Sequence, residues 1–344
     1  MTKFKHFHLK NEMLIANCLA NLIGVFFAST TLYFAGGFAD RQIWQHSVPF
    51  WIDALFDPFA FSFVCVMTLI YEKPIRRYLN LLFNQADIPP ELKTAARRRL
   101  LNEPFVLIAL SFSMWLLAAI VYPLIHWVYG SGSNMVQHAL TNALSSGIIT
   151  VTVAFFLLEH ILQKELAPHF FPEGGLTTVP RTLRIRIRTR LVALLFACNL
   201  IPLISIMWML HRITSTQPDL NIAVPQLRSA IFANAIIFLG VGIFLTMLIA
   251  RNLSIPFKEI VQTLNWVRNG RFDKKVRVTT NDEIGYTGDV INEMTEGLKE
   301  RERLQQSLNI AMEVQQNLLP NQVPQIDGLD IAGTSIYCEE TGGD

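Results

Sequence analysis

Residues 256–298 read PFKEIVQTLNWVRNGRFDKKVRVTTNDEIGYTGDVINEMTEGL, and this stretch decides how the rest of the chain is interpreted. It contains two runs whose apolar side chains recur at intervals of three, four or seven residues, as in the seam of a helix packed against other helices. Two short helices cannot bury such seams alone, so we expect a parallel dimer that forms a four-helix bundle. The seam residues are Phe257, Ile260, Leu264 and Val267, then Ile284, Ile291, Met294 and Leu298.

The residues between the two seams predict a break, a connector and a helix start. Gly270 interrupts the first helix, and the following residues read as an extended, half-buried connector. Asn281 or Asp282 is placed to cap the second helix, and Glu283 suits the positive end of its dipole.

The stretch resembles a HAMP domain, the signal converter that follows a membrane span in many receptors. An ordinary helical hairpin would explain the seams but not the acidic turn directly after a membrane exit. The resemblance is carried by Pro256, Gly270, the run Asp282-Glu283-Ile284-Gly285, Asn292 and Met294.

Composition places most of the 344 residues in a membrane. The chain is 51% hydrophobic and 16% charged, whereas soluble domains carry about 25% charged residues. A helical span needs about 20 apolar residues, and six stretches qualify, so we expect an all-α membrane protein with a six-helix bundle. The spans are 13–34, 55–71, 104–127, 142–158, 191–210 and 230–250.

Basic residues predict the orientation, because Lys and Arg accumulate in cytoplasmic loops. The N-terminal tail, the loop 72–103 and the loop 159–190 are rich in them. The opposite side carries only Arg41, Arg212 and Arg228. We therefore expect both termini in the cytoplasm and a multi-pass protein of the bacterial inner (cytoplasmic) membrane.

The segment 181–190, RTLRIRIRTR, largely alternates arginine with Ile or Thr. We interpret it as an anchor to anionic lipid headgroups that enforces topology. No aromatic residues interleave the arginines, so nucleic acid is not expected as a partner.

Polar residues at membrane depth are candidates for a ligand site. We single out His126, His138, Glu159 and His160 as a possible site for an unknown small ligand, quinone, lipid or metal. The alternative is that they lie at the interface or hydrogen-bond between helices. The histidine spacing makes a metal cluster a weak hypothesis, and Cys18, Cys65 and Cys198, which fall in apolar segments, are interpreted as packing residues.

The first four spans also read as a duplicated hairpin. Residues 71–75, YEKPI, end the second span much as residues 158–162, LEHIL, end the fourth. A helical extension is expected after each.

The last 37 residues, from Leu308 onward, resemble the opening of the SpoIIE/RsbU-type PPM protein phosphatases. A helix is expected to end at residues 319–320, followed by a first strand at 329–337. The resemblance implies an α/β catalytic domain with paired Mn²⁺ or Mg²⁺ ions, Asp344 being the first metal ligand. The matching residues are Ala311, Gln315, Leu318, Leu319, Pro320, Pro324, Gly328 and the run Glu340-Thr341-Gly342-Gly343-Asp344.

These observations predict four parts: a sensor of six transmembrane helices (1–250), a HAMP domain (251–300), a coiled-coil signalling helix (301–319) and the start of a PPM phosphatase (320–344). The resemblance implies a homodimeric receptor whose intact form dephosphorylates serine or threonine of a STAS-type anti-anti-sigma protein. One carboxylate cannot hold two metal ions, so we expect this chain alone to be inactive.

Two alternatives stay open. A HAMP-coupled adenylate or diguanylate cyclase would also place an output domain after the signalling helix, and a GGD run is short enough to arise there. A non-enzymatic transporter or lipid-binding membrane protein would explain the spans but gives no reason for the acidic turn.

Overall fold

The computed structural model describes residues 3–35, 50–172, 174–184, 186–216 and 220–318, with residues 327, 328, 330 and 333. Within these residues the chain is predominantly helical and forms no strand. Six helices in the described part of the chain are long and apolar enough to cross a membrane, which agrees with the six spans predicted from the sequence. The six are Phe7–Thr30, Ala54–Tyr71, Pro90–Val128, Ser133–Phe170, Ile187–His211 and Ala223–Arg268.

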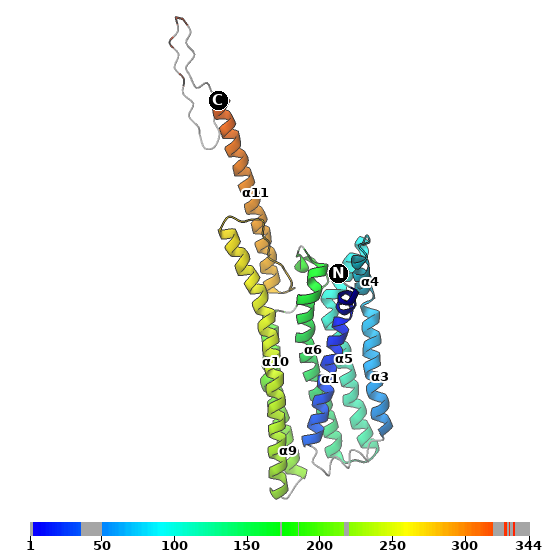
Figure 1. Ribbon diagram of the computed structural model, residues 1–344. Helices are drawn as coiled ribbons and strands as arrows, with labels where there is room; N and C mark the ends of the chain where they lie inside the picture. Colours follow the sequence, from blue (N-terminus) through cyan, green and yellow to red (C-terminus); the bar gives the residue numbers. More distant parts are fainter. Residues whose placement is uncertain are drawn as a thin grey trace. The chain divides into compact units, whose positions relative to one another are not determined.

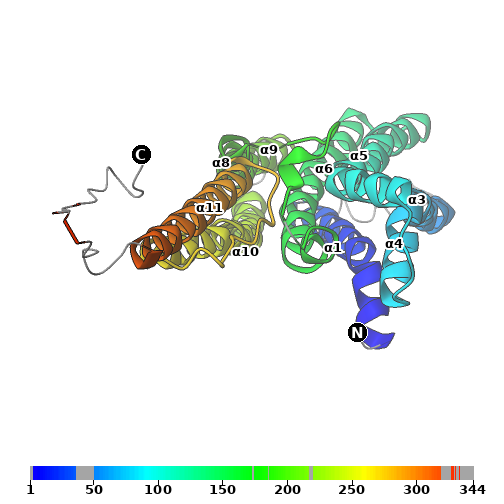
Figure 2. The ribbon, with the colours of Figure 1, turned by 90° about the horizontal axis from the view of Figure 1, so that it is seen from above.

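Helices α1 (Lys3–Ala35), α3 (Phe50–Tyr71), α5 (Pro90–Val128) and α6 (Ser133–Ile161) lie side by side in Figures 1 and 2. Lipid supplies no hydrophobic drive between helices, so their close approach depends on small side chains and on hydrogen bonds. Gly147 of α6 provides such an approach, because a Cβ there would lie 2.8 Å from the Trp115 Cβ of α5.

Short helical extensions follow α3 and α6, as the sequence predicts. They are α4 (Lys73–Phe83), and the π-helical turn η1 (Leu162–Leu166) with α7 (Ala167–Phe170). Tyr78 of the first extension stacks on Phe170 of the second, with ring centroids 4.3 Å apart. The Arg97 Nε of α5 donates to the Phe170 carbonyl oxygen at 2.9 Å. The two hairpins are therefore joined at this end of the bundle.

The fifth span consists of α8 (Ile187–Leu195), the π-helical turn η3 (Phe196–Leu200) and α9 (Ile201–Thr216). Pro202 explains the π-helical turn, since its ring would clash with the carbonyl four residues earlier in a regular α-helix. The sixth span belongs to α10 (Leu220–Arg268), a single helix of 49 residues that runs through Pro256.

Contacts group the chain into two compact units. The first comprises Met1–Phe257 with Arg277–Tyr286, and the second comprises Lys258–Val276 with Thr287–Asp344. The residues around the acidic turn thus pack with the membrane helices, although they are distant from them in sequence.

The predicted helix break and helix start are both confirmed. Helix α10 ends at Arg268, and Gly270 follows with φ +72°, a left-handed conformation that glycine adopts without strain. Helix α11 runs from Glu283 to Leu318. Of the two candidate caps, Asp282 is the one used, because its Oδ1 accepts the backbone N–H groups of Ile284 and Gly285 at 3.0 Å each.

In the second unit the connector is fastened to α11 by one asparagine. The Val276 N–H donates to Asn292 Oδ1 at 2.6 Å, and Asn292 Nδ2 donates to the Val276 carbonyl oxygen at 2.9 Å. The pair satisfies both backbone groups of an extended residue, as a neighbouring strand would.

Helix α11 is described as far as Leu318, and residues 319–320, where the sequence predicts the end of the signalling helix, lie outside the described residues. The predicted strand at 329–337 falls almost wholly outside the described residues, and Asp344 also lies outside them.

We predict that Gly24→Ala lowers the thermal stability of the chain in lipid nanodiscs. A Cβ at Gly24 would lie 1.8 Å from Thr150 Oγ1 and 2.8 Å from a Trp115 ring carbon, so α1 must move away from α5 and α6. Overpacking of this kind costs about 1–3 kcal/mol. Gly240→Ala is the matched control, because nothing lies within 4 Å of its added Cβ. Equal melting temperatures for the two variants would contradict this packing.

Candidate functional site

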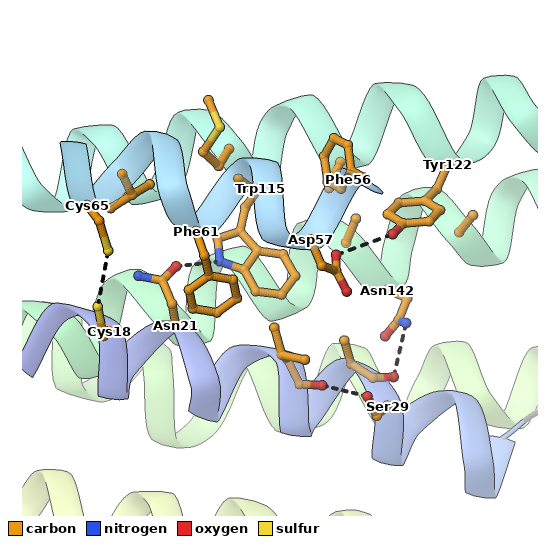
Figure 3. A pocket seen from close by; sticks show the side chains of 18 residues that line it. Cys18, Asn21, Ser29, Phe56, Asp57, Phe61, Cys65, Trp115, Tyr122 and Asn142 are labelled. Atoms are coloured by element: carbon orange, nitrogen blue, oxygen red, sulfur yellow. Dashed lines mark hydrogen bonds between the residues drawn. The ribbon is translucent and has the colours of Figure 1, made fainter. Parts of the chain in front are cut away.

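A cavity of about 220 Å³ lies between α1, α3, α5 and α6 (Figure 3). Its wall is mainly apolar and aromatic, and a few polar side chains converge on it, the composition of small-molecule sites in proteins. Phe61, Trp115 and Tyr122 supply rings, while Ala60, Ala118 and Ala143 leave the space open. All of these residues belong to the first compact unit.

One wall of the cavity is held by a buried chain of hydrogen bonds between α1 and α5. Asn21 Nδ2 donates to Ser111 Oγ at 2.9 Å, and Ser111 Oγ donates to Asn17 Oδ1 at 3.1 Å. Trp115 Nε1 donates to Asn21 Oδ1 at 3.3 Å, which fixes the indole beside the cavity (Figure 3). Sequence reasoning missed Asn17 and Asn21, although two asparagines four residues apart on one face of an apolar span signal such a contact.

A carboxylate stands at the other side of the cavity. Figure 3 shows Asp57 beside Tyr122, whose hydroxyl donates to Asp57 Oδ1 at 3.5 Å. The Tyr122 ring makes an edge contact with Phe56, with centroids 5.5 Å apart. Across the cavity, Asn142 Nδ2 donates to the Ala28 carbonyl oxygen at 3.2 Å. Among the described residues that line the cavity, Asp57 is the one charged side chain.

Two cysteines also meet at this cavity. The Sγ atoms of Cys18 on α1 and Cys65 on α3 lie 3.7 Å apart (Figure 3). Their separation of 47 positions in the sequence gave no signal for a pair. Both thiols are free, so they contribute to helix packing as predicted.

The four residues singled out from the sequence do not form one site. His126 and His138 lie near the ends of α5 and α6 that face the Gly130 turn, whereas Glu159 and His160 lie at the far end of α6. His138 and His160 are 22 residues apart in one helix, which corresponds to about 33 Å. None of the four lines the cavity described above.

Each of these residues has a separate environment. His126 Nδ1 lies 3.2 Å from Ser131 Oγ. His138 lines a second cavity, of about 260 Å³, between α6, α9 and α10. His160 Nδ1 donates to Asn252 Oδ1 of α10 at 2.6 Å. Among the described residues no three His, Cys, Asp or Glu side chains are grouped to hold a metal ion.

Glu159 belongs to a buried charge cluster with Arg190 and Asp282. One arginine nitrogen, Nη2, pairs with Glu159 Oε1, and Nη1 pairs with Asp282 Oδ2 at 2.7 Å. The exposed fractions are only 8%, 5% and 6% for the three residues, so the ion pairs are shielded from water. The cluster links the end of α6, the first turns of α8 and the start of α11.

The two carboxylate oxygens of Asp282 have different roles. Oδ2 faces Arg190, while Oδ1 caps α11 and also accepts the Thr280 hydroxyl at 2.6 Å. Next to it, Glu283 Oε2 accepts the Ile187 N–H, an otherwise unsatisfied donor at the start of α8, at 3.0 Å. The arginine that orients Asp282 therefore also influences the cap of α11.

The interpretation of the arginine segment needs a correction at one position. Arg181, Arg184, Arg186 and Arg188 are exposed and available to lipid headgroups, but Arg190 is buried among carboxylates. The alternating pattern of the segment does not distinguish Arg190 from the other arginines, because its partners Glu159 and Asp282 lie 31 positions before it and 92 positions after it.

A second buried carboxylate follows α3. Glu72, 2% exposed, accepts a hydrogen bond from Arg76 Nε at 2.5 Å, and Arg76 Nη1 donates to Asn11 Oδ1 at 2.9 Å. Burial raises the pKa of Glu72, and its hydrogen bonds with Glu103 and Arg76 oppose part of that rise. Each of the two hairpins thus ends in a buried glutamate paired with an arginine.

Searches of protein-family models, of curated proteins and of solved structures return no match for this chain. Its function has to be argued from the cavity, the charge cluster and the sequence patterns themselves.

We predict that Arg190→Ala destabilises the protein strongly. Removing the guanidinium leaves two buried carboxylates without their counter-charge, and breaking a buried pair costs about 3–5 kcal/mol. The matched control is Arg188→Ala, which removes an exposed charge from the same segment and should change the melting temperature little. The triple variant Arg190→Met, Glu159→Gln, Asp282→Asn should regain most of the loss. A change in melting temperature for Arg190→Ala that is as small as the change for Arg188→Ala would contradict the cluster.

We also predict that Glu72→Gln flattens the dependence of stability on pH. Because the native pKa of Glu72 is raised, folding favours its protonated form. Its contribution is complete below the ordinary glutamate pKa of about 4.3 and is lost as pH rises through the native pKa. Thermal melts across this window should show wild type losing stability relative to Glu72→Gln. Glu91→Gln, at an exposed glutamate, should show the same dependence of melting temperature on pH as wild type. If Glu72→Gln also shows the wild-type dependence on pH, the raised native pKa of Glu72 is contradicted.

Proposed function

We propose that this chain is the signal-receiving and signal-converting part of a bacterial inner-membrane receptor. The observation that carries the proposal is the Glu159–Arg190–Asp282 cluster, which ties a membrane helix to the cap of α11. A receptor needs a contact of this kind, because a change within the membrane must reach the helix that leads to the output.

Helix α6 connects the cavity to this cluster. Asn142 and Ala143 line the cavity, and Glu159 lies on the same helix 16–17 residues later, about 25 Å away. A ligand that favours one position of α6 would move Glu159 and hence Arg190. Binding then shifts the population between two arrangements of the α11 cap, since a ligand changes an equilibrium only by its differential affinity for the two states.

The second unit is interpreted as the chain's share of a HAMP bundle. Within one chain Ile260 and Ile291 are buried, but the seam residues Leu264 and Met294 remain 40% and 46% exposed. Exposed apolar residues along a helical seam favour association with the same seam of a second copy. We therefore propose a parallel homodimer whose signalling helix continues to Leu318.

The basic loops support a cytoplasmic location for both termini. The residues from 308 onward support a PPM phosphatase as output of the intact protein, with a phosphorylated STAS-type substrate. Asp344, the first metal ligand that the resemblance implies, lies outside the described residues.

The proposed relay, in which a change at the cavity reaches α11 through α6 and Arg190, is tested by filling the cavity and measuring a distance on α11. We predict that Ala60→Phe, which places a ring in the cavity, changes the distance between spin labels at Lys299→Cys in the two chains by about 1–2 Å. The measurement uses electron–electron resonance in nanodiscs, in a background whose four cysteines are replaced by alanine.

Two comparisons decide the outcome. Ala54→Phe, at an exposed position of the same helix, should leave the distance unchanged. The triple variant Arg190→Met, Glu159→Gln, Asp282→Asn combined with Ala60→Phe should abolish the change, because the cavity is filled but the ionic link to Asp282 is cut. A change that persists in the combined variant would contradict the relay, and the absence of any interchain distance would contradict the dimer.

A further inference from the structure

We infer that the second cavity, between α6, α9 and α10, binds an aliphatic alcohol by its hydroxyl group. The inference goes beyond the proposed receptor function, because the cavity used in the proposed relay lies between α1, α3, α5 and α6. It depends on two polar atoms at the wall of the second cavity and on the apolar surface around them. The described residues that line this cavity all belong to the first compact unit.

The first polar atom is the carboxamide oxygen of Asn234, on α10. The side chain lines the cavity, and the residue is only 4% exposed. Its Nδ2 donates to Ser205 Oγ of α9 at 2.9 Å, whereas no described residue donates to its buried Oδ1. A buried acceptor without a donor is costly, so this atom favours a ligand that donates a hydrogen bond.

The second polar atom is the indole nitrogen of Trp208, on α9. Trp208 follows Ser205 by three residues, so the two side chains share one face of the helix, and both line the cavity. Its Nε1 is buried, and within the described part of the chain nothing accepts its hydrogen. One donor and one acceptor thus border the same cavity, and a single hydroxyl group can satisfy both.

Packing between α9 and α10 keeps these two atoms at the wall. Met209, Ile213, Ala223 and Ala230 form a buried cluster between the two helices. Asn234 lies four residues after Ala230 and therefore on the same face of α10. The carboxamide is held toward α9 and the cavity by this packing and by its bond to Ser205.

Other hydroxyl groups at the cavity are engaged within the protein. Thr30, Thr141 and Ser145 donate to carbonyl oxygens of their own helices. The two atoms on α9 and α10 therefore identify the end of the cavity at which the hydroxyl of a ligand binds.

The rest of the described lining is mainly apolar, which sets the body of the ligand. Apolar cavities exclude water and bind organic molecules. At the packing density of protein interiors, about 260 Å³ accommodates roughly ten non-hydrogen atoms. An alcohol with about nine carbons meets this limit. The larger aliphatic side chains of the lining are Leu144, Ile148, Ile201, Ile204 and Ile237.

Three probes of equal size test the inference on the full chain in nanodiscs. Nonan-1-ol donates and accepts a hydrogen bond, 1-methoxyoctane only accepts, and decane does neither. Each competes with a nonan-1-ol analogue that carries a photoactivatable diazirine, and mass spectrometry locates the labelled residues. Competitor amounts are counted per lipid, so that partition into the bilayer does not enter the comparison.

The expected order follows from the two hydrogen bonds. We expect labels within 138–148, 201–209 and 230–237. Nonan-1-ol should compete at about one-tenth of the amount of 1-methoxyoctane, and the ether at about one-third of the amount of decane, because each missing bond leaves a buried group unsatisfied.

Two substitutions assign the two bonds. Asn234→Leu should remove the advantage of the alcohol over the ether, and Trp208→Phe should remove the advantage of the ether over decane. Asn199→Leu is the matched control, because it replaces an exposed asparagine of the fifth span and should leave both advantages unchanged.

Equal competition by the alcohol and the ether in wild type would overturn the inference, as would labels confined to other surfaces of the chain. If Asn234→Leu melts far below wild type, Trp208→Phe decides: an unchanged advantage of the ether over decane in that variant would overturn it as well. The relay is tested separately by the spin labels at residue 299, so the alcohol site and the receptor function can fail independently.

Discussion

The guanidinium of Arg190 is shielded from water and held by two carboxylates that are far apart in the sequence. Moving a charged group out of water costs several kcal/mol, and attraction offsets that cost only where the geometry is well satisfied. Glu159, Arg190 and Asp282 must therefore stay together for any of them to remain buried. This requirement fixes the end of α6 against the start of α8, and both against the cap of α11.

The cavity lies toward the other end of α6 and depends on a different kind of polar contact. The Asn17–Ser111–Asn21–Trp115 hydrogen bonds are uncharged and join α1 to α5, so they shape one wall. Hydrogen-bonded side chains between membrane helices are modest in energy but specific in geometry. One helix thus carries a formed cavity near one end and a buried ion pair at the other. This arrangement supports the proposal of a receptor whose signal travels along α6.

Features that depend on neighbouring residues could be predicted from the sequence. The six spans follow from apolar length, the end of α10 from Gly270, and the start of α11 from Asp282, because each is decided within a few residues. The buried glutamates near the ends of α3 and α6 could be noticed from the sequence only because the segments 71–75 and 158–162 resemble each other. Their burial depends on arginines contributed by the fold, Arg76 for the first and Arg190 for the second.

Features that depend on long-range pairing could not be predicted. The contact between Cys18 and Cys65, the wall formed by Asn21 and Trp115, and the position of Arg190 all require knowledge of which helices are adjacent. The grouping of His126 and His138 with Glu159 and His160 is a different error, because the predicted spans already place the first two and the last two residues at opposite ends of the bundle. Periodicity reports which face of a helix is apolar, and it does not identify the partner of a polar side chain.

We propose that Glu159, through Arg190, holds the carboxylate that caps α11. Hydrogen–deuterium exchange of the full chain in nanodiscs tests it at the amides of Ile284 and Gly285, which donate to Asp282. Glu159→Gln removes one charge from a different helix, and Glu165→Gln removes one from a half-exposed neighbour paired with Lys164. The account predicts faster exchange at the start of α11 in Glu159→Gln and wild-type exchange in Glu165→Gln. Identical exchange at these amides in wild type and Glu159→Gln would contradict it.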